Sequence, residues 1–251
     1  MAELRTAGTL TGISAARRRD LWWLQPLLVF LGLGIFIVYA TYRGLAGDFY
    51  AWGPYLSPFY SPLIDPRHHW WPYSPALLIL IGPLGFRTTC YYYRKAYYRA
   101  FFWDPPACAV GELRHGYQGE SSFPLILQNV HRYFFYISFI YLVSLWFDAV
   151  HGFIWDGRFG MGLGSLVLLL NAALLSLYTF SCHSCRHFVG GNLDCFSCAK
   201  FGGGRLGIWR KVTFLNERHM QIAWTSLFWV GFSDLYVRLI SSGAFHDPRF
   251  F

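Results

Sequence analysis

The sequence predicts an all-α fold, an integral membrane bundle of five transmembrane helices with its N-terminus in the cytoplasm. Composition is the first observation: 55% of the 251 residues are hydrophobic and only 14% are charged, whereas soluble domains carry about a quarter charged residues. The second observation is that the apolar residues gather in long uncharged runs, as membrane-spanning helices require. The third is that most basic residues fall between these runs on one side of the membrane.

Each of the five apolar runs covers about 20 residues, enough to cross a hydrocarbon core of about 30 Å as a helix. Gly82-Pro83 lies within the second run and predicts a kink there. Arg87, Asp148 and Asp234 lie inside or near span ends, so we expect them to face other helices or the interface rather than lipid. The whole chain, 1–251, is predicted to form a single transmembrane domain. The predicted spans are about 22–42, 71–92, 129–153, 160–181 and 219–240.

The orientation follows from the distribution of Lys and Arg. With the N-terminus in the cytoplasm, the inner segments 1–21, 87–132 and 182–218 hold 16 of the 21 basic residues. The positive-inside rule accounts for this asymmetry. The net charge of +8 therefore does not indicate nucleic-acid binding.

All six cysteines fall on the predicted cytoplasmic side, where a reducing environment makes disulfides unexpected. Four of them form two Cys-x-x-Cys pairs, Cys182/Cys185 and Cys195/Cys198, separated by nine residues. This spacing lets two thiolates bind one metal, and two such pairs close together are a strong metal signal. We therefore predict a metal-binding loop over 182–198 at the cytoplasmic face.

Histidines near this loop indicate which metal it could hold. Cys185-Arg-His187 has the Cys-x-His spacing of Rieske sites, and His131 and His219 begin the third and fifth spans at the same face. Two cysteines on one iron and two histidines on the other would form a Rieske-type [2Fe–2S] cluster, whose imidazole ligands raise the reduction potential. A structural zinc ion fits the cysteine spacing at least as well. A further alternative is a haem-bearing quinone reductase subunit that uses His131, His151 or His219.

Several segments together resemble one known family. The most specific is YTFSCHSCRHFVGG over 178–191, supported by NERHMQIAW over 216–224, LVSLWFD over 142–148, and the segments 55–62 and 83–90. They resemble the membrane subunit of a haem-free class of respiratory complex II, the succinate:quinone oxidoreductases of actinobacteria. The resemblance covers most of the chain.

The resemblance implies a five-helix anchor in the bacterial plasma membrane that carries two peripheral subunits of succinate dehydrogenase. One is a flavoprotein that oxidises succinate, and the other is an iron–sulfur protein that relays electrons. It also implies a Rieske-type [2Fe–2S] cluster at the cytoplasmic end and a membrane quinone, menaquinone or ubiquinone, reduced nearby. We further expect bound lipid and a higher oligomer of the complex, and no catalysis from this chain alone. The basic residues expected to dock the peripheral subunits are Arg94, Lys95, Arg99, Arg210 and Lys211.

The cluster implied by this resemblance takes its ligands from the loop and from the helix starts. The predicted ligands are Cys182, Cys185, His187 and His219, with His131 and His183 in reserve. Cys195 and Cys198 exceed what one cluster needs. They either replace histidines as ligands, hold a second metal or take no part.

A quinone site needs hydrogen-bond donors for the carbonyl oxygens and an apolar channel for the tail. Polar and aromatic residues near the cytoplasmic face are candidates for this role. They are Arg94, Tyr97, Tyr98, His131 and Arg132. Taken one at a time, each is better explained as an interfacial anchor or a positive-inside charge.

Overall fold

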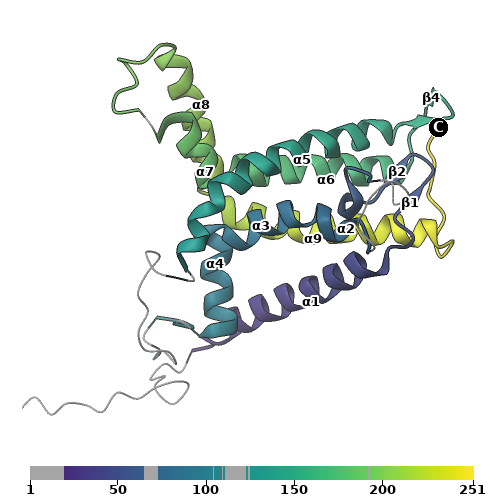
Figure 1. Cartoon of the computed structure of the whole chain (residues 1–251), viewed down its shortest axis with the longest axis horizontal. Helices are drawn as coiled ribbons and strands as arrows, with labels where there is room; N and C mark the ends of the chain where they lie inside the picture. The colour runs from purple at the N-terminus through teal and green to yellow at the C-terminus, as the bar shows by residue number, and fades with distance from the viewer. Residues whose placement is uncertain are drawn as a thin grey trace, which may run out of the picture.

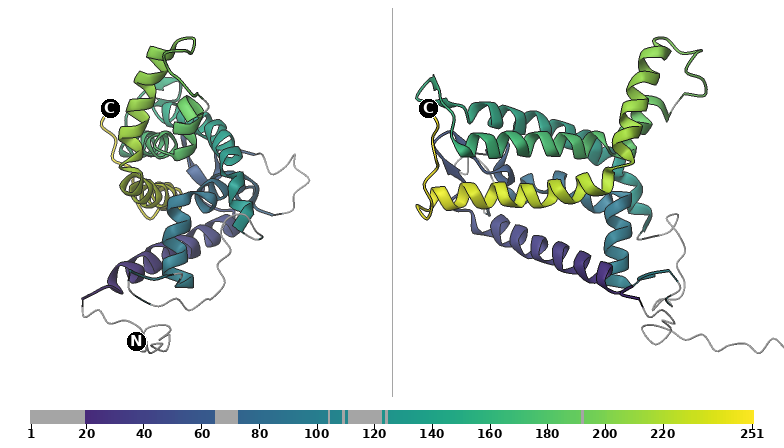
Figure 2. Two further views of the ribbon diagram at one scale, coloured as in Figure 1. Left: turned by 90° about the vertical axis from the view of Figure 1, so that its left-hand side faces the viewer. Right: turned by 180° about the vertical axis from the view of Figure 1, so that it is seen from behind.

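The structure is a computed structural model that describes residues 20–64, 73–103, 105–108, 110, 123, 125–191 and 193–251. Its long helices run side by side in an elongated bundle (Figures 1 and 2). The bundle comprises α1 (Leu24–Ala46), α2 (Ala76–Ile79), α3 (Ile81–Thr89), α5 (His131–His151), α6 (Leu163–Phe180) and α9 (His219–Ser241). Most of the predicted N-terminal segment 1–21, and the start of the predicted second span, lie outside the described residues.

Two short hairpins lie at one end of the bundle, beside the C-terminus (Figure 1), and we call this the hairpin end. Strand β1 (Ala51–Trp52) pairs antiparallel with β2 (Tyr55–Leu56), and β3 (Ile154–Trp155) pairs antiparallel with β4 (Arg158–Phe159). The 3-10 helix η2 (Pro58–Tyr60) follows the first hairpin.

At the opposite end, which we call the α4 end, the chain turns away from the bundle axis. Helix α4 crosses the end of the bundle, and α8 projects away from it (Figures 1 and 2). The elements here are α4 (Tyr91–Tyr97), the π-helix η4 (Tyr98–Phe102), the 3-10 helix η5 (Leu125–Val130), α7 (His183–Arg186), the π-helix η6 (His187–Gly191) and α8 (Gly202–Asn216).

Three helices in the described part of the chain are long and apolar enough to cross a membrane: Leu24–Ala46, Ile126–His151 and Leu163–Phe180. The second predicted span appears as the shorter apolar stretch Ala76–Thr89. Helix α9 has 23 residues, and its inward-facing polar residues make it less apolar. An all-α membrane protein is thus confirmed, whereas the five-span topology and the orientation stay predictions.

The second predicted span, 71–92, is interrupted just before Gly82-Pro83 and again at Cys90. Helix α2 ends at Ile79 and α3 begins at Ile81, two residues before Pro83, which has no N–H to continue the helical bonding. Helix α3 ends at Thr89, and Cys90 takes an extended conformation that turns the chain into α4. The helix is therefore shorter than the predicted range 71–92.

Helix α3 packs closely on α5 because glycines face it. A Cβ atom at Gly82 would overlap Tyr141, and one at Gly85 would overlap Phe134. Larger residues at these positions would separate the two helices and move the end of α3. This contact therefore holds Cys90 close to the start of α5.

The hairpin end is held by a buried ion pair between α1 and α9. The Arg43 Nε donates to Asp234 Oδ2 at 2.9 Å, and both side chains have 0% exposure. The hydroxyls of Tyr39 and Ser57 also donate to Asp234. The remaining guanidinium nitrogens of Arg43 bond to Asp48. Asp234 faces another helix, as predicted, and every polar atom of this pair has a partner.

Candidate metal centre

Four metal-binding side chains meet at the α4 end, and each comes from the end of a different element. Cys90 lies between α3 and α4, and His131 is the first residue of α5. Cys182 follows α6, and His219 is the first residue of α9. Because the bundle helices lie side by side, their ends place these four residues in the same layer. All four line one cavity of about 1150 Å³.

The four side chains form two cysteine–histidine contacts. The Cys90 Sγ lies 3.3 Å from His219 Nε2, and the Cys182 Sγ lies 3.0 Å from His131 Nε2. The two thiols are also close enough for Cys90 to affect the ionisation of Cys182. Two thiols and two imidazoles thus share one site, in which Cys90, Cys182 and His219 are buried and His131 is half-buried.

Hydroxyl groups hold the far nitrogen of each imidazole. His219 Nδ1 lies 2.7 Å from the hydroxyl of Ser181, and His131 Nδ1 lies 2.9 Å from that of Thr89. Such outer hydrogen bonds fix the orientation and tautomer of metal-binding histidines. In this arrangement Nε2 of each ring points toward a thiol.

The thiols are strongly shielded from water. Burial raises the pKa of Cys182 to about 12, and the neighbouring Cys90 adds to the shift. Such a thiol is neutral at physiological pH unless a metal cation stabilises its thiolate. The ionisation of the site is therefore linked to metal binding.

The four side chains supply the donor types of a Rieske-type cluster, two cysteines and two histidines. Among the described residues, no group of three or more His, Cys, Asp or Glu side chains is arranged to hold a metal ion. The donors come instead as two pairs. A Rieske-type [2Fe–2S] cluster takes two cysteines on one iron and two histidines on the other. The four residues match it in donor type and number, whereas the observed pairs each join one cysteine to one histidine.

Comparison with known proteins identifies the family. A model of the actinobacterial succinate dehydrogenase subunit SdhC matches residues 24–243. The chain belongs to this family. A chain in the solved structure titled "Mycobacterium smegmatis Sdh1 complex in the apo form" is 40% identical, with a TM-score of 0.88 over 100% of this chain and 99% of that chain. No curated protein matches the sequence.

Family membership confirms the main functional prediction from the sequence. The chain is a membrane subunit of succinate dehydrogenase, an oxidoreductase of the respiratory chain, and it assembles with other subunits of that complex. Neither comparison concerns the metal ligands or the quinone site.

The structure distributes the predicted metal ligands of this SdhC chain over four places. Cys182 and His219 lie in the four-residue site. His187 is exposed on η6 and lines the same cavity, as does His183. Cys185 packs into the apolar core, where burial raises its pKa to about 11.

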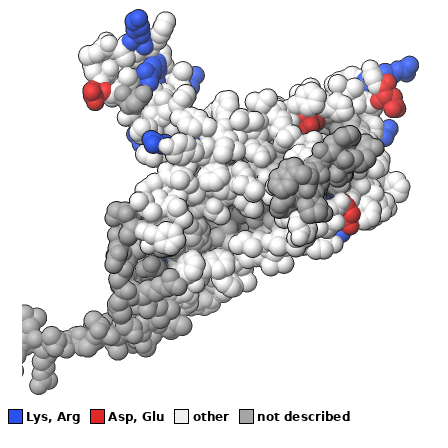
Figure 3. All heavy atoms as spheres, viewed as in Figure 1, with Lys and Arg blue, Asp and Glu red and all other residues white. Residues whose placement is uncertain are grey.

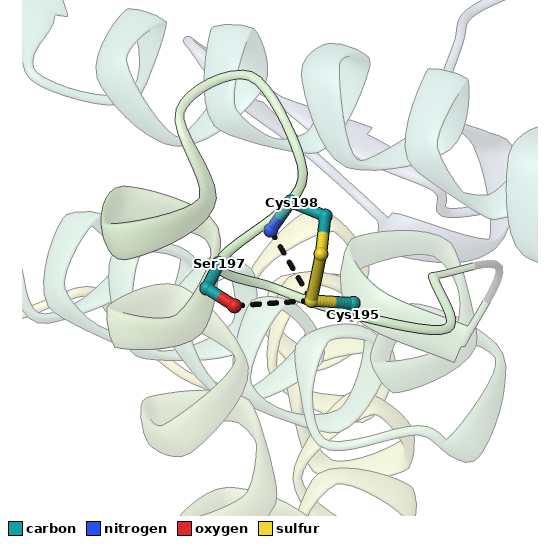
Figure 4. Close-up of a disulfide and its surroundings, with 3 residues drawn as sticks. All are labelled: Cys195, Ser197 and Cys198. Carbon is teal, nitrogen blue, oxygen red and sulfur yellow. Dashed lines mark hydrogen bonds between the residues drawn. A yellow bond between two sulfur atoms is a disulfide. The ribbon is translucent and has the colours of Figure 1, made fainter.

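Cys195 and Cys198 lie in the loop before α8 and form a disulfide with each other (Figure 4). The sequence analysis did not expect a disulfide. A spacing of three residues in a turn brings the two sulfurs together, and Cys198 N–H also donates to Cys195 Sγ at 3.2 Å. Helix α7 and η6 lie between this loop and Cys182 in the chain, and the metal-binding role of the loop 182–198 stays a prediction.

The predicted quinone residues also divide into two groups. Arg94, His131 and Arg132 line the cavity. Tyr97 and Tyr98 lie behind it, and their hydroxyls accept hydrogen bonds from Gln128 Nε2 at 2.7 and 3.3 Å. Gln128 itself lines the cavity.

Sequence reasoning missed Cys90 as a donor, together with Thr89 and Ser181. Local spacing gives no sign of Cys90, because it lies 92 positions before Cys182 and has no neighbouring cysteine. One signal was available: Cys90 ends a predicted span on the same face where the other candidates were placed.

Proposed function

We propose that this chain anchors the flavoprotein and iron–sulfur subunits of succinate dehydrogenase and transfers their electrons to a membrane quinone, menaquinone or ubiquinone. The observation that carries this proposal is the set of two buried thiols and two imidazoles, one buried and one half-buried, at the α4 end. A Rieske-type [2Fe–2S] cluster bound there would supply one-electron transfer at a raised potential, because neutral imidazoles replace two thiolates.

The ligands in this proposal are Cys90, His131, Cys182 and His219. Cys182 and His219 keep their predicted role, and His131 moves from reserve to ligand. Ser181 and Thr89 orient the imidazoles. In this proposal the residues Cys185, His187, Cys195 and Cys198 are not ligands, although their spacing predicted that role.

The α4 end would face the cytoplasm in a five-span bacterial plasma-membrane protein. The Lys and Arg asymmetry supports this orientation. Figure 3 supports the span arrangement, because charged side chains gather on α8 and at the hairpin end with an almost uncharged surface between them. The peripheral subunits would dock on the basic residues of α4, η4 and α8, namely Lys95, Arg99, Arg210 and Lys211. Arg94, which was also predicted to dock them, is buried and lines the cavity.

The quinone headgroup would bind in the cavity beside the metal centre. Arg94 and Arg132 offer donors to its carbonyl oxygens, and the side chains of Phe135, Tyr136 and Phe188 offer apolar lining. Tyr97 and Tyr98 would act through Gln128, which their hydroxyls hold. Bound lipid would cover the exposed apolar sides of the bundle helices.

Electron paramagnetic resonance of the dithionite-reduced complex, purified with its partner subunits, tests the proposal. We expect a rhombic Rieske-type signal that a Cys90→Ser variant loses. The matched control is the double variant Cys195→Ser/Cys198→Ser, which should keep the signal.

Other outcomes would replace the proposal with a specific alternative. A signal that survives Cys90→Ser but is lost in Cys185→Ser would restore the ligand set predicted from spacing. Zinc without acid-labile sulfide would indicate a structural anchor. A Soret band would indicate a haem-bearing subunit.

A further inference from the structure

Arg87 is a buried cation whose partners are all uncharged. It lies in the last turn of α3. Its Nη1 donates to the hydroxyl of Tyr93 at 2.6 Å and to the carbonyl of Ala223 at 3.4 Å, and its Nη2 donates to Ser226 Oγ at 3.1 Å. Among the residues that the structure describes, no Asp or Glu forms an ion pair with it.

A buried guanidinium without a counter-charge is costly. Arginine stays protonated in proteins, so it cannot escape the cost by losing its proton. Taking a charge out of water costs several kcal/mol even after relaxation, and charged residues within membrane bundles normally have a partner. The hydrogen bonds of Nη1 and Nη2 replace some of the lost water but leave the positive charge of Arg87 uncompensated.

The charge lies one aromatic ring away from the metal centre. The Arg87 guanidinium carbon is 4.4 Å from the centroid of the Tyr178 ring. His219 stacks on that ring with the centroids 5.2 Å apart and an interplanar angle of 16°. Cys90 follows Arg87 by three residues, and both thiols pack in the same core cluster as Tyr178.

We infer that Arg87 acts as a positioning residue that raises the reduction potential of the metal centre, and that the reduced centre is its counter-charge. This inference rests on the proposed function. Two thiolates balance the 2+ charge of an oxidised [2Fe–2S] core, and one added electron leaves a net charge of −1. A fixed cation nearby stabilises that reduced form, and burial weakens the screening between the two charges.

The test is a redox titration of the purified complex, followed by electron paramagnetic resonance. Arg87→Gln removes the charge and keeps hydrogen-bond donors, whereas Arg87→Lys keeps the charge. The matched control is Arg218→Gln, which removes an equal charge beside His219 from a side chain with 51% exposure. Solvent screens the charge of Arg218, so its loss should shift the potential little.

We expect Arg87→Gln to favour the oxidised centre at least tenfold, a fall in midpoint potential of about 59 mV or more for one electron. Arg87→Lys should stay near the wild-type value. Loss of the cluster from Arg87→Gln with retention in Arg87→Lys would also support the inference.

An unchanged midpoint in Arg87→Gln would overturn the inference, as would an equal fall in Arg87→Lys or loss of the cluster from both variants. An equal fall in Arg87→Lys, or loss of the cluster from both variants, would show that the shape of the Arg87 side chain matters rather than its charge. An unchanged midpoint in Arg87→Gln would show that neither its shape nor its charge sets the potential. Absence of the signal from the wild-type complex would instead contradict the proposed function itself.

Discussion

The hairpin end and the α4 end each bury an arginine, but they treat its charge differently. At the hairpin end, Arg43 is paired with Asp234 and Asp48, and each of its donors reaches one of them. At the α4 end, the described residues give Arg87 hydroxyl and carbonyl acceptors without a carboxylate. The polar cluster around Arg43 has its counter-charges within the chain. The cluster around Arg87 instead combines an uncompensated positive charge with the thiol and imidazole donors of the candidate metal centre.

The difference indicates that the polar residues at the hairpin end stabilise the fold, whereas those at the α4 end form the candidate metal centre. The Arg43–Asp234 pair joins α1 to α9 and connects both to the segment before η2 through Ser57. The thiols and imidazoles at the α4 end hold one another only weakly. Together they offer two sulfur and two nitrogen donors to a metal. Substitutions at the hairpin end should therefore affect stability first, and those at the α4 end should affect the metal first.

The largest expected effect is at the hairpin end. Asp234→Asn leaves the Arg43 charge buried without its closest partner, which typically costs about 3–5 kcal/mol. We expect a clearly lower thermal unfolding midpoint for the detergent-solubilised complex, with a normal metal signal in the fraction that remains folded.

The matched control is Asp48→Asn, at a side chain with 45% exposure. Exposed pairs contribute about 0–1 kcal/mol, so this variant should unfold close to the wild-type temperature. Equal midpoints for the two variants would show that the buried pair does not hold the hairpin end.

A smaller effect is expected from the hydroxyl that orients His219. Ser181→Ala removes the 2.7 Å contact to Nδ1, and loss of such an outer partner typically weakens metal binding 10- to 100-fold. Resistance of the signal to chelators would measure this change, and the unfolding midpoint should fall little.

Ser176→Ala is the matched control for that measurement, because its hydroxyl bonds to Ala172 and Trp146 within the bundle. It removes the same atom from the same helix without touching an imidazole. If Ser181→Ala held the cluster as firmly as Ser176→Ala, the orientation of His219 would not depend on Ser181.

The sequence predicts features that depend on local residues better than features that depend on contacts between distant segments. The membrane class and the subunit family depend on composition and local motifs, and both are confirmed. Cys182 and His219 were found because each stands at the end of a recognisable span. Cys90 was missed because its contact with His219 depends on which helices are neighbours, and a chain separation of 129 residues hides that.

The Cys-x-x-Cys motif is likewise a local signal. A spacing of three residues allows two side chains to meet across a turn, and Cys195 and Cys198 meet in this way. The spacing carries no information on burial. Cys182 ends a helix of the bundle, whereas Cys195 lies in the loop before a helix that projects from it, and that difference decides which thiol joins the site.

The smallest expected effect distinguishes the packed bundle from the projecting α8. Gly207 lies within α8, and a Cβ atom there would meet nothing within 4 Å. Gly207→Ala should therefore stabilise α8 by about 0.4–1 kcal/mol, because it reduces the freedom of the unfolded chain. Hydrogen exchange of the α8 amides should slow by about two- to fivefold where exchange occurs by local opening.

Gly85→Ala is the contrasting variant, since its new methyl group would overlap Phe134 and should cost about 1–3 kcal/mol. Faster exchange in Gly207→Ala would mean that another subunit packs on this face of α8 and requires its glycine.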